Sequence, residues 1–400
     1  MKILFVNRFY APDHSATSQL LTDLATALAA EGREVHVVTS RLLYDDPSAR
    51  LAARELRDGV MIHRIPTTRF GRGSLPGRAV DYASFHASAA WTVFGLARRG
   101  DIVVAKTDPP LLSVAVGWAA CLRGARRVNW LQDLFPEAAT ALRVRGTRHL
   151  SRLLTWLRDR SLHGATNVVL GARMRERIRA RGVPDTSIAV IPNWADGRAL
   201  HHVAHAENPL RAGWTLDGAF VVGYSGNMGR AHEIRSILDA AEALRDEPDI
   251  RFLFIGGGAQ SAGVEVAARG NPAIQFRPYQ PRAHLAQSLG AADVHIVTLR
   301  PELEDAIVPS KFYGVVAAAR PVIFIGAADG EIGRLVVEAE CGVVIAPGAP
   351  AELAGAIRAL RDDPELRVRL GRNARLLFET RFDQPIAIAK WRAVLDEASR

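Results

Sequence analysis

Short apolar runs alternate with amphipathic stretches along the whole chain. The runs that we expect to form strands lie at residues 3–6, 34–39, 60–65, 102–106, 128–131, 168–170, 188–191, 220–224, 252–255 and 321–325. Between them, apolar residues recur at the spacing of a helix face, as in Leu20, Leu24 and Leu28 before Gly32. This alternation predicts an α/β fold with doubly wound parallel sheets. Ligands of such sheets bind beyond the carboxyl ends of the strands.

The length of the chain fits two domains. Its 400 residues are 48% hydrophobic and 23% charged, so each half can bury its own core. Cys121 and Cys341 lie in apolar runs, and we expect two buried thiols in a reducing compartment. Met1 leads directly into the first strand, and the longest apolar run, residues 111–122, is too short to cross a bilayer. These features predict a cytoplasmic protein without a signal peptide.

The net charge of +9 is concentrated in one half of the chain. Residues 1–200 carry a net charge of +12, nearly all of it from arginine, whereas residues 201–400 carry −3. An excess confined to one half predicts a polyanionic partner for that half, and nucleic acid and an anionic membrane both qualify. No nucleic-acid-binding motif accompanies the charge, so we expect no nucleic-acid partner.

A helix start at Pro309 is the first candidate for chemistry. Proline suits the first helical position, which predicts that the backbone amides of Ser310, Lys311 and Phe312 have no partner. Those amides and the Lys311 side chain would together form an anion site. The alternative is an ordinary α/β unit with Lys311 as a solvated surface charge. A buried strand at 321–325 and a second helix start near Glu331 follow.

Loops after other predicted strands carry further candidates. Residues 225–230 read Ser-Gly-Asn-Met-Gly-Arg, and residues 256–258 are three glycines. Small residues let backbone approach a ligand, and the Arg230 guanidinium can clamp a phosphate through two nitrogens. By themselves, three glycines indicate only a tight turn. Asp133 follows a strand in the first half, where it either faces a substrate or serves as a helix cap or an arginine partner.

These segments resemble the retaining glycosyltransferases of family 4, which have the GT-B architecture. The resemblance rests on Pro309-Ser310-Lys311, Ala317-Ala318-Ala319-Arg320-Pro321-Val322, the glycines at 256–258 and Asn193-Trp194-Ala195-Asp196. It covers the whole chain, more closely in the C-terminal half. The resemblance implies two Rossmann-like domains, an acceptor-binding domain at 1–198 and a nucleotide-sugar-binding domain at 199–382. The last helix, 383–400, would pack back onto the first domain.

The resemblance also implies roles for single residues. Lys311 and Arg230 would act as catalytic residues that stabilise the departing diphosphate, without a metal or other cofactor. Asp133 would orient the acceptor hydroxyl, and His232 is the nearest candidate for a second basic residue. The other residues expected to contact the donor are Asn227, Gly229, Gly257, Gly258, Tyr279, Ser310, Phe312 and Glu331.

The chain departs from the family pattern at its paired glutamates. These would fall at Ala306 and Gly314, and neither residue is acidic. Glu304, Asp305 and Glu331 are candidates to replace the lost contact to the donor ribose. Two alternatives therefore stay open, a catalytically inactive scaffold that binds nucleotide sugars and a nucleotide-sugar 2-epimerase of the same architecture. The histidines at 201, 202 and 205 lack partner ligands, so we expect no metal site there.

The resemblance points to sugar transfer from a nucleotide-sugar donor to a glycan or polyprenyl-diphosphate-linked acceptor, in bacterial exopolysaccharide or cell-surface polysaccharide synthesis. We expect a peripheral protein whose N-terminal domain binds the anionic inner face of the plasma membrane. Residues 142–163 support this with an apolar stripe among arginines, although a helix packed on its own sheet has the same pattern. The stripe is Leu150, Leu153, Leu154 and Leu157, and the arginines are Arg143, Arg145, Arg148, Arg152, Arg158 and Arg160. A second candidate patch is Trp91, Phe94 and Leu96.

Overall fold

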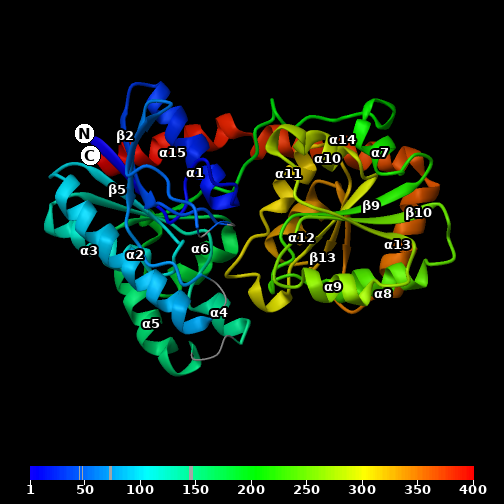
Figure 1. Cartoon of the computed structure of the whole chain (residues 1–400), viewed down its shortest axis with the longest axis horizontal. Coiled ribbons are helices and arrows are strands. Elements are labelled where there is room, and N and C mark those ends of the chain that lie inside the picture. Colours follow the sequence, from blue (N-terminus) through cyan, green and yellow to red (C-terminus); the bar gives the residue numbers. More distant parts are fainter. Residues whose placement is uncertain (45, 47, 72–73, 144–146) are drawn as a thin grey trace. The chain divides into compact units, whose positions relative to one another are not determined.

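The chain folds into two compact α/β units. The structure is a computed structural model that describes residues 1–44, 46, 48–71, 74–143 and 147–400. Unit 1 comprises Met1–Pro192 together with Ile388–Arg400, and unit 2 comprises Asn193–Ala387 (Figure 1). The sequence predicted that the chain passes from one domain to the other after residues 198 and 382. In the structure, the chain passes from one unit to the other after Pro192 and Ala387.

Unit 1 contains an eight-stranded sheet with the order β3-β4-β2-β1-β5-β6-β7-β8. All neighbouring strands are parallel except β3 and β4, which are antiparallel. The strands are β1 (Lys2–Val6), β2 (Glu34–Ser40), β3 (Arg54–Arg57), β4 (Val60–Ile65), β5 (Ile102–Lys106), β6 (Arg126–Trp130), β7 (Thr166–Val169) and β8 (Ile188–Val190). The strand order reverses between β1 and β5, which makes their carboxyl ends the expected place for a ligand.

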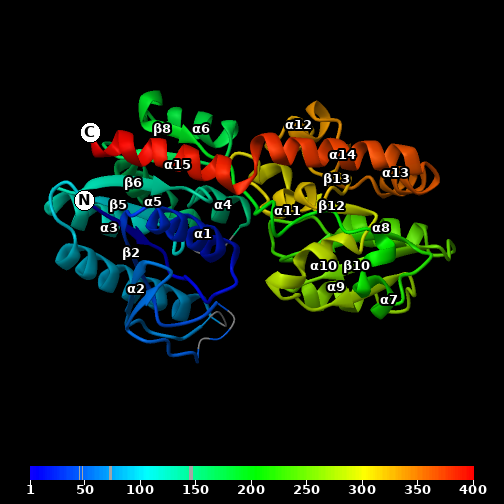
Figure 2. The same cartoon turned by 90° about the horizontal axis from the view of Figure 1, so that it is seen from above.

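The helices of unit 1 cover both faces of this sheet, and Figure 2 shows α2 and α15 on opposite sides of it. They are α1 (Ala16–Ala30), α2 (Leu75–Leu96), α3 (Leu112–Leu122), α4 (Glu137–Ala141), α5 (Thr147–Leu162), α6 (Ala172–Arg179) and, from Ile388 onward, the final helix α15 (Gln384–Ser399). On α15 the buried Trp391 ring packs 4.5 Å from the ring of Trp130 on β6. Salt bridges from Arg33 to Asp396 and from Arg392 to Glu31 also hold α15 to unit 1.

Unit 2 contains a six-stranded, wholly parallel sheet with the order β11-β10-β9-β12-β13-β14. This is the Rossmann order, with its reversal between β9 and β12. The strands are β9 (Phe220–Ser225), β10 (Ile250–Ile255), β11 (Ile274–Arg277), β12 (Val294–Thr298), β13 (Val322–Ile325) and β14 (Gly342–Ile345). The helices are α7 (Pro209–Gly213), α8 (Arg235–Ala243), α9 (Ser261–Ala267), α10 (Leu285–Gly290), α11 (Lys311–Ala317), α12 (Glu331–Glu338), α13 (Pro350–Asp362) and α14 (Pro364–Arg381).

The predicted α/β architecture is confirmed, with some corrections. The strands β3, β11, β12 and β14 were not predicted, and β3 makes the first sheet mixed. The expectation of two buried thiols is wrong for Cys121, which is exposed, and right for Cys341, which is buried. No helix in the described part of the chain is both long enough and apolar enough to cross a membrane.

Candidate active site

Two loops interlock at the carboxyl ends of β9 and β10 in unit 2. The amide of Gly226 donates to the Ile255 carbonyl at 2.8 Å, and the amide of Met228 donates to the Gly257 carbonyl at 2.7 Å. Gly258 has φ +140°, and a Cβ atom there would lie 2.4 Å from Oδ1 of Asn227. The packing of one loop against the other therefore requires glycine at Gly258. The loops form a rigid edge of backbone groups beside the strand-order reversal.

Lys311 extends from the start of α11 to the loop after β9. Its Nζ atom donates to the Tyr224 hydroxyl at 2.5 Å and to the Asn227 carbonyl at 3.2 Å. The ammonium also lies 3.8 Å from the centre of the Tyr224 ring, within cation–π range. Burial lowers the pKa of the Lys311 amino group well below its usual value. The interpretation of Lys311 as a solvated surface charge is therefore wrong, and its role at a donor site stays a prediction.

The start of α11 differs from the prediction. The helix begins at Lys311, two residues later than the predicted first position, and the Phe312 amide donates to the Pro309 carbonyl at 3.3 Å. The Phe312 side chain is fully buried, with edge-to-face contacts to Tyr313 and Phe382, so it is a core residue and not a donor contact. Ser310 is exposed. With only seven residues in α11, the Lys311 side chain supplies the positive charge here.

His232 does not provide a second cation. Its Nδ1 atom lies 2.7 Å from the Thr298 carbonyl, and burial together with the charge of Lys311 lowers the pKa of the imidazole to about 3. The ring is therefore neutral near pH 7, and it packs edge-on to Tyr224. His232 therefore packs against the tyrosine that holds Lys311, and the Thr298 carbonyl fixes the imidazole in place.

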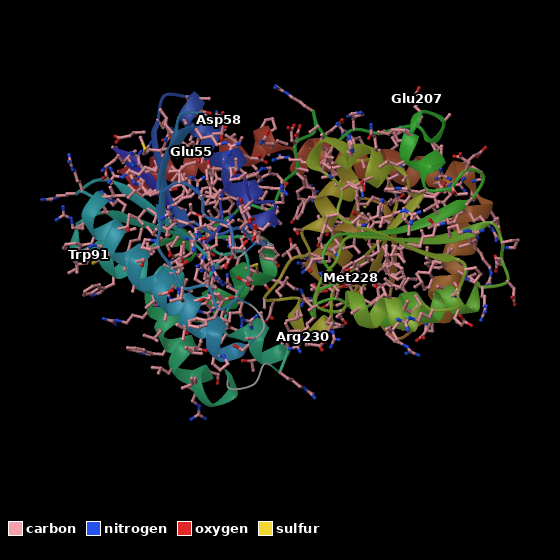
Figure 3. The ribbon with its side chains drawn as sticks, viewed as in Figure 1. Glu55, Asp58, Trp91, Glu207, Met228 and Arg230 are labelled. Atoms are coloured by element: carbon pink, nitrogen blue, oxygen red, sulfur yellow. The ribbon has the colours of Figure 1, made fainter. Side chains whose placement is uncertain are left out.

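Arginines on two loops border this site. Arg230 is exposed at the end of the loop after β9 and has no hydrogen bond or ion pair with any described residue (Figure 3). Arg300, which follows β12, was missed by the sequence reading. Its amide donates to the Ala231 carbonyl at 3.0 Å, next to Arg230, and its Nε atom is buried without a hydrogen-bond partner among the described residues. The only sequence signal for Arg300 was its place just after an apolar run.

Tyr279 supplies an exposed aromatic ring beside the glycine turn. It follows β11, and 56% of its surface is accessible. A Cβ atom at Gly256 would lie 3.1 Å from the Tyr279 ring, and one at Gly257 would lie 3.7 Å from it. Asn227 and Gly229 lie in the neighbouring loop, with Asn227 exposed. An exposed ring held against glycine backbone is suited to stacking on a planar ligand.

Two acidic residues, Glu304 and Glu331, lie at the start of α12. The buried carboxylate of Glu304 lies at the start of this helix, where a Cβ atom on Gly330 would be 2.2 Å from Oε2 of Glu304. Glu331 is the first residue of α12 and pairs with Arg334 on the same helix at 3.5 Å. At Gly314, where the family has a glutamate, a side chain would point at Leu289, 3.4 Å away. The Glu304 carboxylate therefore packs against the start of α12 at Gly330.

Asp133 lies at the carboxyl edge of the unit 1 sheet, in the loop after β6. Its side chain hydrogen-bonds the hydroxyl of Thr107, which follows the adjacent strand β5. Burial raises the pKa of the Asp133 carboxyl group, and the hydrogen bond to Thr107 opposes that rise. Its Oδ1 atom is buried without a hydrogen-bond partner in the described chain, and it pairs with no described arginine. Neither structural alternative, a helix cap or a salt bridge, describes this carboxylate.

Besides Asp133, other buried polar atoms in the segments after β1 and β4 have no hydrogen-bond partner among described residues. They are Asn7 Oδ1, Arg8 Nε, Ser15 Oγ and Thr67 Oγ1. Leaving a buried polar atom unpaired is costly, so such a cluster suits a surface that a polar ligand completes.

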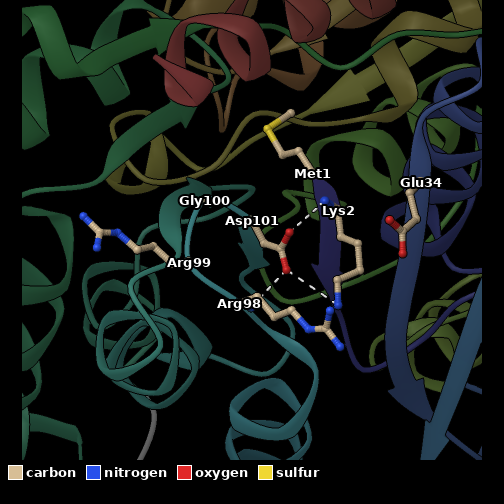
Figure 4. Close-up of a pocket in the computed structure, with 7 residues that line it drawn as sticks. All are labelled: Met1, Lys2, Glu34, Arg98, Arg99, Gly100 and Asp101. Carbon is tan, nitrogen blue, oxygen red and sulfur yellow. Dashed lines mark hydrogen bonds and ion pairs between the residues drawn. The ribbon is translucent and has the colours of Figure 1, made fainter.

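Two other features of the chain do not resemble a catalytic site. A pocket of about 460 Å³ lies at the opposite, amino edge of the unit 1 sheet, where Lys2 pairs with Asp101 (Figure 4). His205 lies 3.7 Å from Asp293, but the described residues contain no group of three or more His, Cys, Asp or Glu side chains that could hold a metal. Burial lowers the pKa of His205 to about 4.

Comparison with known proteins gives consistent results for both units. Residues 16–194 match the glycosyl transferase 4-like domain, and residues 219–363 match the glycosyl transferases group 1 family. WcaI of Escherichia coli, named as a colanic acid biosynthesis glycosyl transferase, is 28% identical over 84% of this chain and 86% of its own length. WbjE of Pseudomonas aeruginosa, named as a glycosyltransferase, is 30% identical over 74% of each chain.

Solved structures share the fold. The crystal structure of Anabaena HepE in complex with UDP-glucose has a TM-score of 0.74 and 17% identity, and the match covers 99% of this chain and 100% of HepE. The matches do not support the epimerase alternative.

Proposed function

Because the chain belongs to the family 4 type of glycosyltransferases with the GT-B fold, we propose that unit 2 binds a nucleotide sugar and that unit 1 binds a glycan or polyprenyl-diphosphate-linked acceptor. The sugar is transferred with retention. The product belongs to a bacterial exopolysaccharide or another cell-surface polysaccharide, as the name of WcaI suggests for that relative.

The position of the Lys311 ammonium carries this proposal. A departing nucleoside diphosphate gains negative charge in the transition state, and a fixed cation at that point lowers the barrier. Lys311 is held by Tyr224 and Asn227 beside the loop after β9, so its charge needs little reorganisation. Its lowered pKa reflects a poorly solvated ammonium, which gains most from an anionic partner.

The remaining donor groups follow from the same geometry. Arg300 and Arg230 add positive charge beside the diphosphate. Arg300 takes the role of the second basic residue, for which the sequence suggested His232. Tyr279 stacks on the nucleobase at the glycine turn, where Gly257 and Gly258 bring backbone close. The binding of UDP-glucose by HepE supports a nucleotide sugar as the donor. Asn227, Gly229, Ser310 and Glu331 remain candidate donor contacts, with Glu331 as one candidate to replace a glutamate at Gly314.

Asp133 orients the acceptor hydroxyl in this proposal. Retaining transfer needs no strong base on the enzyme, because the departing phosphate oxygen can take the acceptor proton. A carboxylate oxygen that is buried and unpaired in the described chain would accept a hydrogen bond from the acceptor and align it for attack.

We further propose that unit 1 works at the anionic inner face of the plasma membrane, through α5. Leu150, Leu153 and Trp156 are each more than half exposed on this helix, which argues against packing of the whole stripe on the sheet. Leu154 and Leu157 are half-buried, and Arg152 and Arg160 are exposed. Arg145 lies outside the described residues, and the side chain of Arg148 is likewise not described.

One arginine of the predicted basic set has a structural role. Arg158 is buried, and both of its terminal nitrogens donate to the Glu137 carboxylate on α4, at 2.6 and 3.1 Å. Because α4 follows the Asp133 loop, this ion pair joins the exposed helix to the acceptor side of the sheet. Arg158 is therefore removed from the set that would contact lipid.

A panel of nucleotide sugars tests the transferase proposal. We expect one donor to raise the melting temperature of the protein and to release free nucleotide faster when a lipid-linked acceptor is present. Binding of a donor without acceptor-dependent release would favour the inactive scaffold that Gly314 suggested. Absence of both effects across the panel would overturn the proposal.

A further inference from the structure

An uncharged helix lies on the surface of unit 1. The eleven residues of α3, Leu112–Leu122, include no charged side chain. Its inner face is fully buried, as Val116 and Ala120 illustrate, yet Trp118 is 67% exposed and Leu122 is 56% exposed. A helix that is apolar on all sides is normally covered on all sides. At eleven residues, α3 is too short to span a bilayer.

The neighbouring helix α2 continues this apolar surface. Trp91 is 79% exposed and Phe94 is 41% exposed, and Figure 3 shows Trp91 at the outer edge of unit 1. The core face of α2 is separate from these residues, since Phe85 and Val93 are fully buried against the sheet. Leu96, which we grouped with Trp91 and Phe94 from the sequence, is half-buried and packs against that core.

The ends of the two helices are joined by an arginine. Arg123 follows α3 directly; its Nε atom donates to the Ala97 carbonyl at 3.1 Å, and its guanidinium lies 5.2 Å from the centre of the Phe94 ring. The C-terminal ends of α2 and α3 therefore lie together, with Phe94 on α2 beside the end of α3. Trp91 lies about one turn before Phe94 on α2, and Trp118 lies about one turn before Leu122 on α3. We call these four residues the α2–α3 patch. An exposed apolar cluster of this kind marks an interaction surface.

Positive charge borders the α2–α3 patch. Arg98, Arg99 and Arg123 follow the two helices, and none of them forms an ion pair with a described residue. The nearby carboxylate of Asp101 is already used by Lys2 and by the backbone amides of Lys2 and Arg98 (Figure 4). A partner for this surface must therefore offer apolar groups in its middle and negative charge at its rim.

We propose that the α2–α3 patch inserts into the headgroup region of an anionic membrane, as a second contact beside α5. Tryptophan favours this region because its ring is apolar and its N–H group is polar, and arginines at the rim pair with anionic headgroups. A second copy of the chain would bring the same three arginines face to face, which disfavours self-association. The inference rests on the proposed lipid-linked acceptor, since it explains why the enzyme would bind a membrane.

The native cysteines allow a direct test without engineering. Cys121 lies on the exposed side of α3, between Trp118 and Leu122, whereas Cys341 is fully buried. An environment-sensitive thiol-reactive fluorophore should therefore label Cys121 selectively. We expect its emission to shift to shorter wavelength with vesicles that contain phosphatidylglycerol, and much less with phosphatidylcholine alone. High salt should weaken the shift.

Substitution separates the patch from the rest of the surface. Trp91→Ala with Trp118→Ala should lower the partition of the unlabelled protein onto phosphatidylglycerol vesicles by roughly tenfold or more in flotation. Val368→Ser with Leu376→Ser, which changes two comparably exposed apolar residues on α14 in unit 2, should leave it unchanged. Transfer to a short-chain, water-soluble acceptor should be the same for all three proteins.

Three outcomes would overturn the inference. They are the absence of an emission shift with anionic vesicles, an equal loss of partition in the α14 variant, and a shift without vesicles that rises with protein concentration, which would indicate self-association. Failure of the transferase proposal is distinguishable, because vesicle binding is measured without donor and the soluble acceptor is measured without vesicles.

Discussion

The Nζ atom of Lys311 lies 3.8 Å from the centre of the Tyr224 ring and donates a hydrogen bond to the hydroxyl of the same residue. A lysine at the start of one helix is thereby held against the carboxyl end of strand β9, 87 positions away in the sequence. The arrangement fixes a positive charge at the strand-order reversal of unit 2, where ligands of doubly wound sheets bind.

Lys311→Ala should lower turnover by roughly ten- to a thousandfold, because it removes a fixed cation from the developing negative charge. Tyr224→Phe keeps the ring under the ammonium and removes only the hydroxyl, so we expect a smaller loss of roughly two- to tenfold. Steady-state kinetics with saturating acceptor measures both values, and circular dichroism checks the fold. Normal turnover in the Lys311→Ala variant would show that the diphosphate does not bind here.

Donor affinity should depend on pH through Lys311. Burial lowers the pKa of the free amino group, and a bound diphosphate restores it by favouring the charged form. At a pH above the pKa of the free enzyme, binding is then accompanied by proton uptake, so affinity is full below that pKa and falls as the pH rises above it. Calorimetric titration with the nucleotide sugar in buffers of different ionisation enthalpy measures that uptake. The Lys311→Ala variant should bind more weakly and show no such uptake.

Arg300 should contribute more to donor binding than Arg230. The backbone of Arg300 is fixed by its hydrogen bond to Ala231, and its Nε atom is buried without a hydrogen-bond partner in the described chain, whereas Arg230 is exposed. We expect Arg300→Gln to raise the donor KM by roughly tenfold or more, and Arg230→Gln to have a smaller effect. The exposed Arg235, paired with Asp239 on α8, offers a control in Arg235→Gln. A larger effect at Arg230 would restore the sequence-based assignment.

The sequence revealed the elements whose local pattern matches their tertiary environment. Buried strands such as β5 and β13 are continuous apolar runs, and both were predicted. The edge strand β3 was missed because Arg-Glu-Leu-Arg is charged, as unpaired sheet edges often are. Phe312 was assigned to the donor through its backbone amide, but that amide donates to the Pro309 carbonyl and the side chain is buried in the core.

The candidate site could be predicted only where a motif marks it. Lys311 was predicted because it follows Pro309 and Ser310 at an expected helix start. Tyr224 reads as one more apolar residue of a buried strand, and only the three-dimensional packing brings its hydroxyl to the ammonium. The residue type of His232 suggests a cation, but burial lowers the pKa of its imidazole and leaves the ring neutral. Side-chain ionisation depends on solvation, which no linear pattern encodes.

Asp133→Asn should impair transfer to the acceptor more than it impairs donor binding. The change keeps the size of the side chain and its contact with Thr107, but it replaces a carboxylate that can align the acceptor hydroxyl. We expect turnover to fall by roughly tenfold or more while the donor-induced rise in melting temperature is kept. Thr107→Val tests whether Thr107 positions the Asp133 carboxylate, and it should lower turnover less than Asp133→Asn does. A lower melting temperature with equal loss of both functions would make Asp133 a structural residue.

The exposed stripe on α5 should bind anionic membranes independently of catalysis on soluble acceptors. Leu150→Asn with Leu153→Asn removes apolar groups that are 55% and 53% exposed, so the fold should be kept while partition onto phosphatidylglycerol vesicles falls. Arg152→Glu should weaken binding at low salt and lose its effect at high salt, because electrostatic attraction to the surface is screened. Flotation at two salt concentrations measures both effects, with Arg175→Glu on α6 as a charge-matched control. If wild-type protein stays unbound at low salt, or if the α5 variants float as it does, α5 does not dock on the membrane.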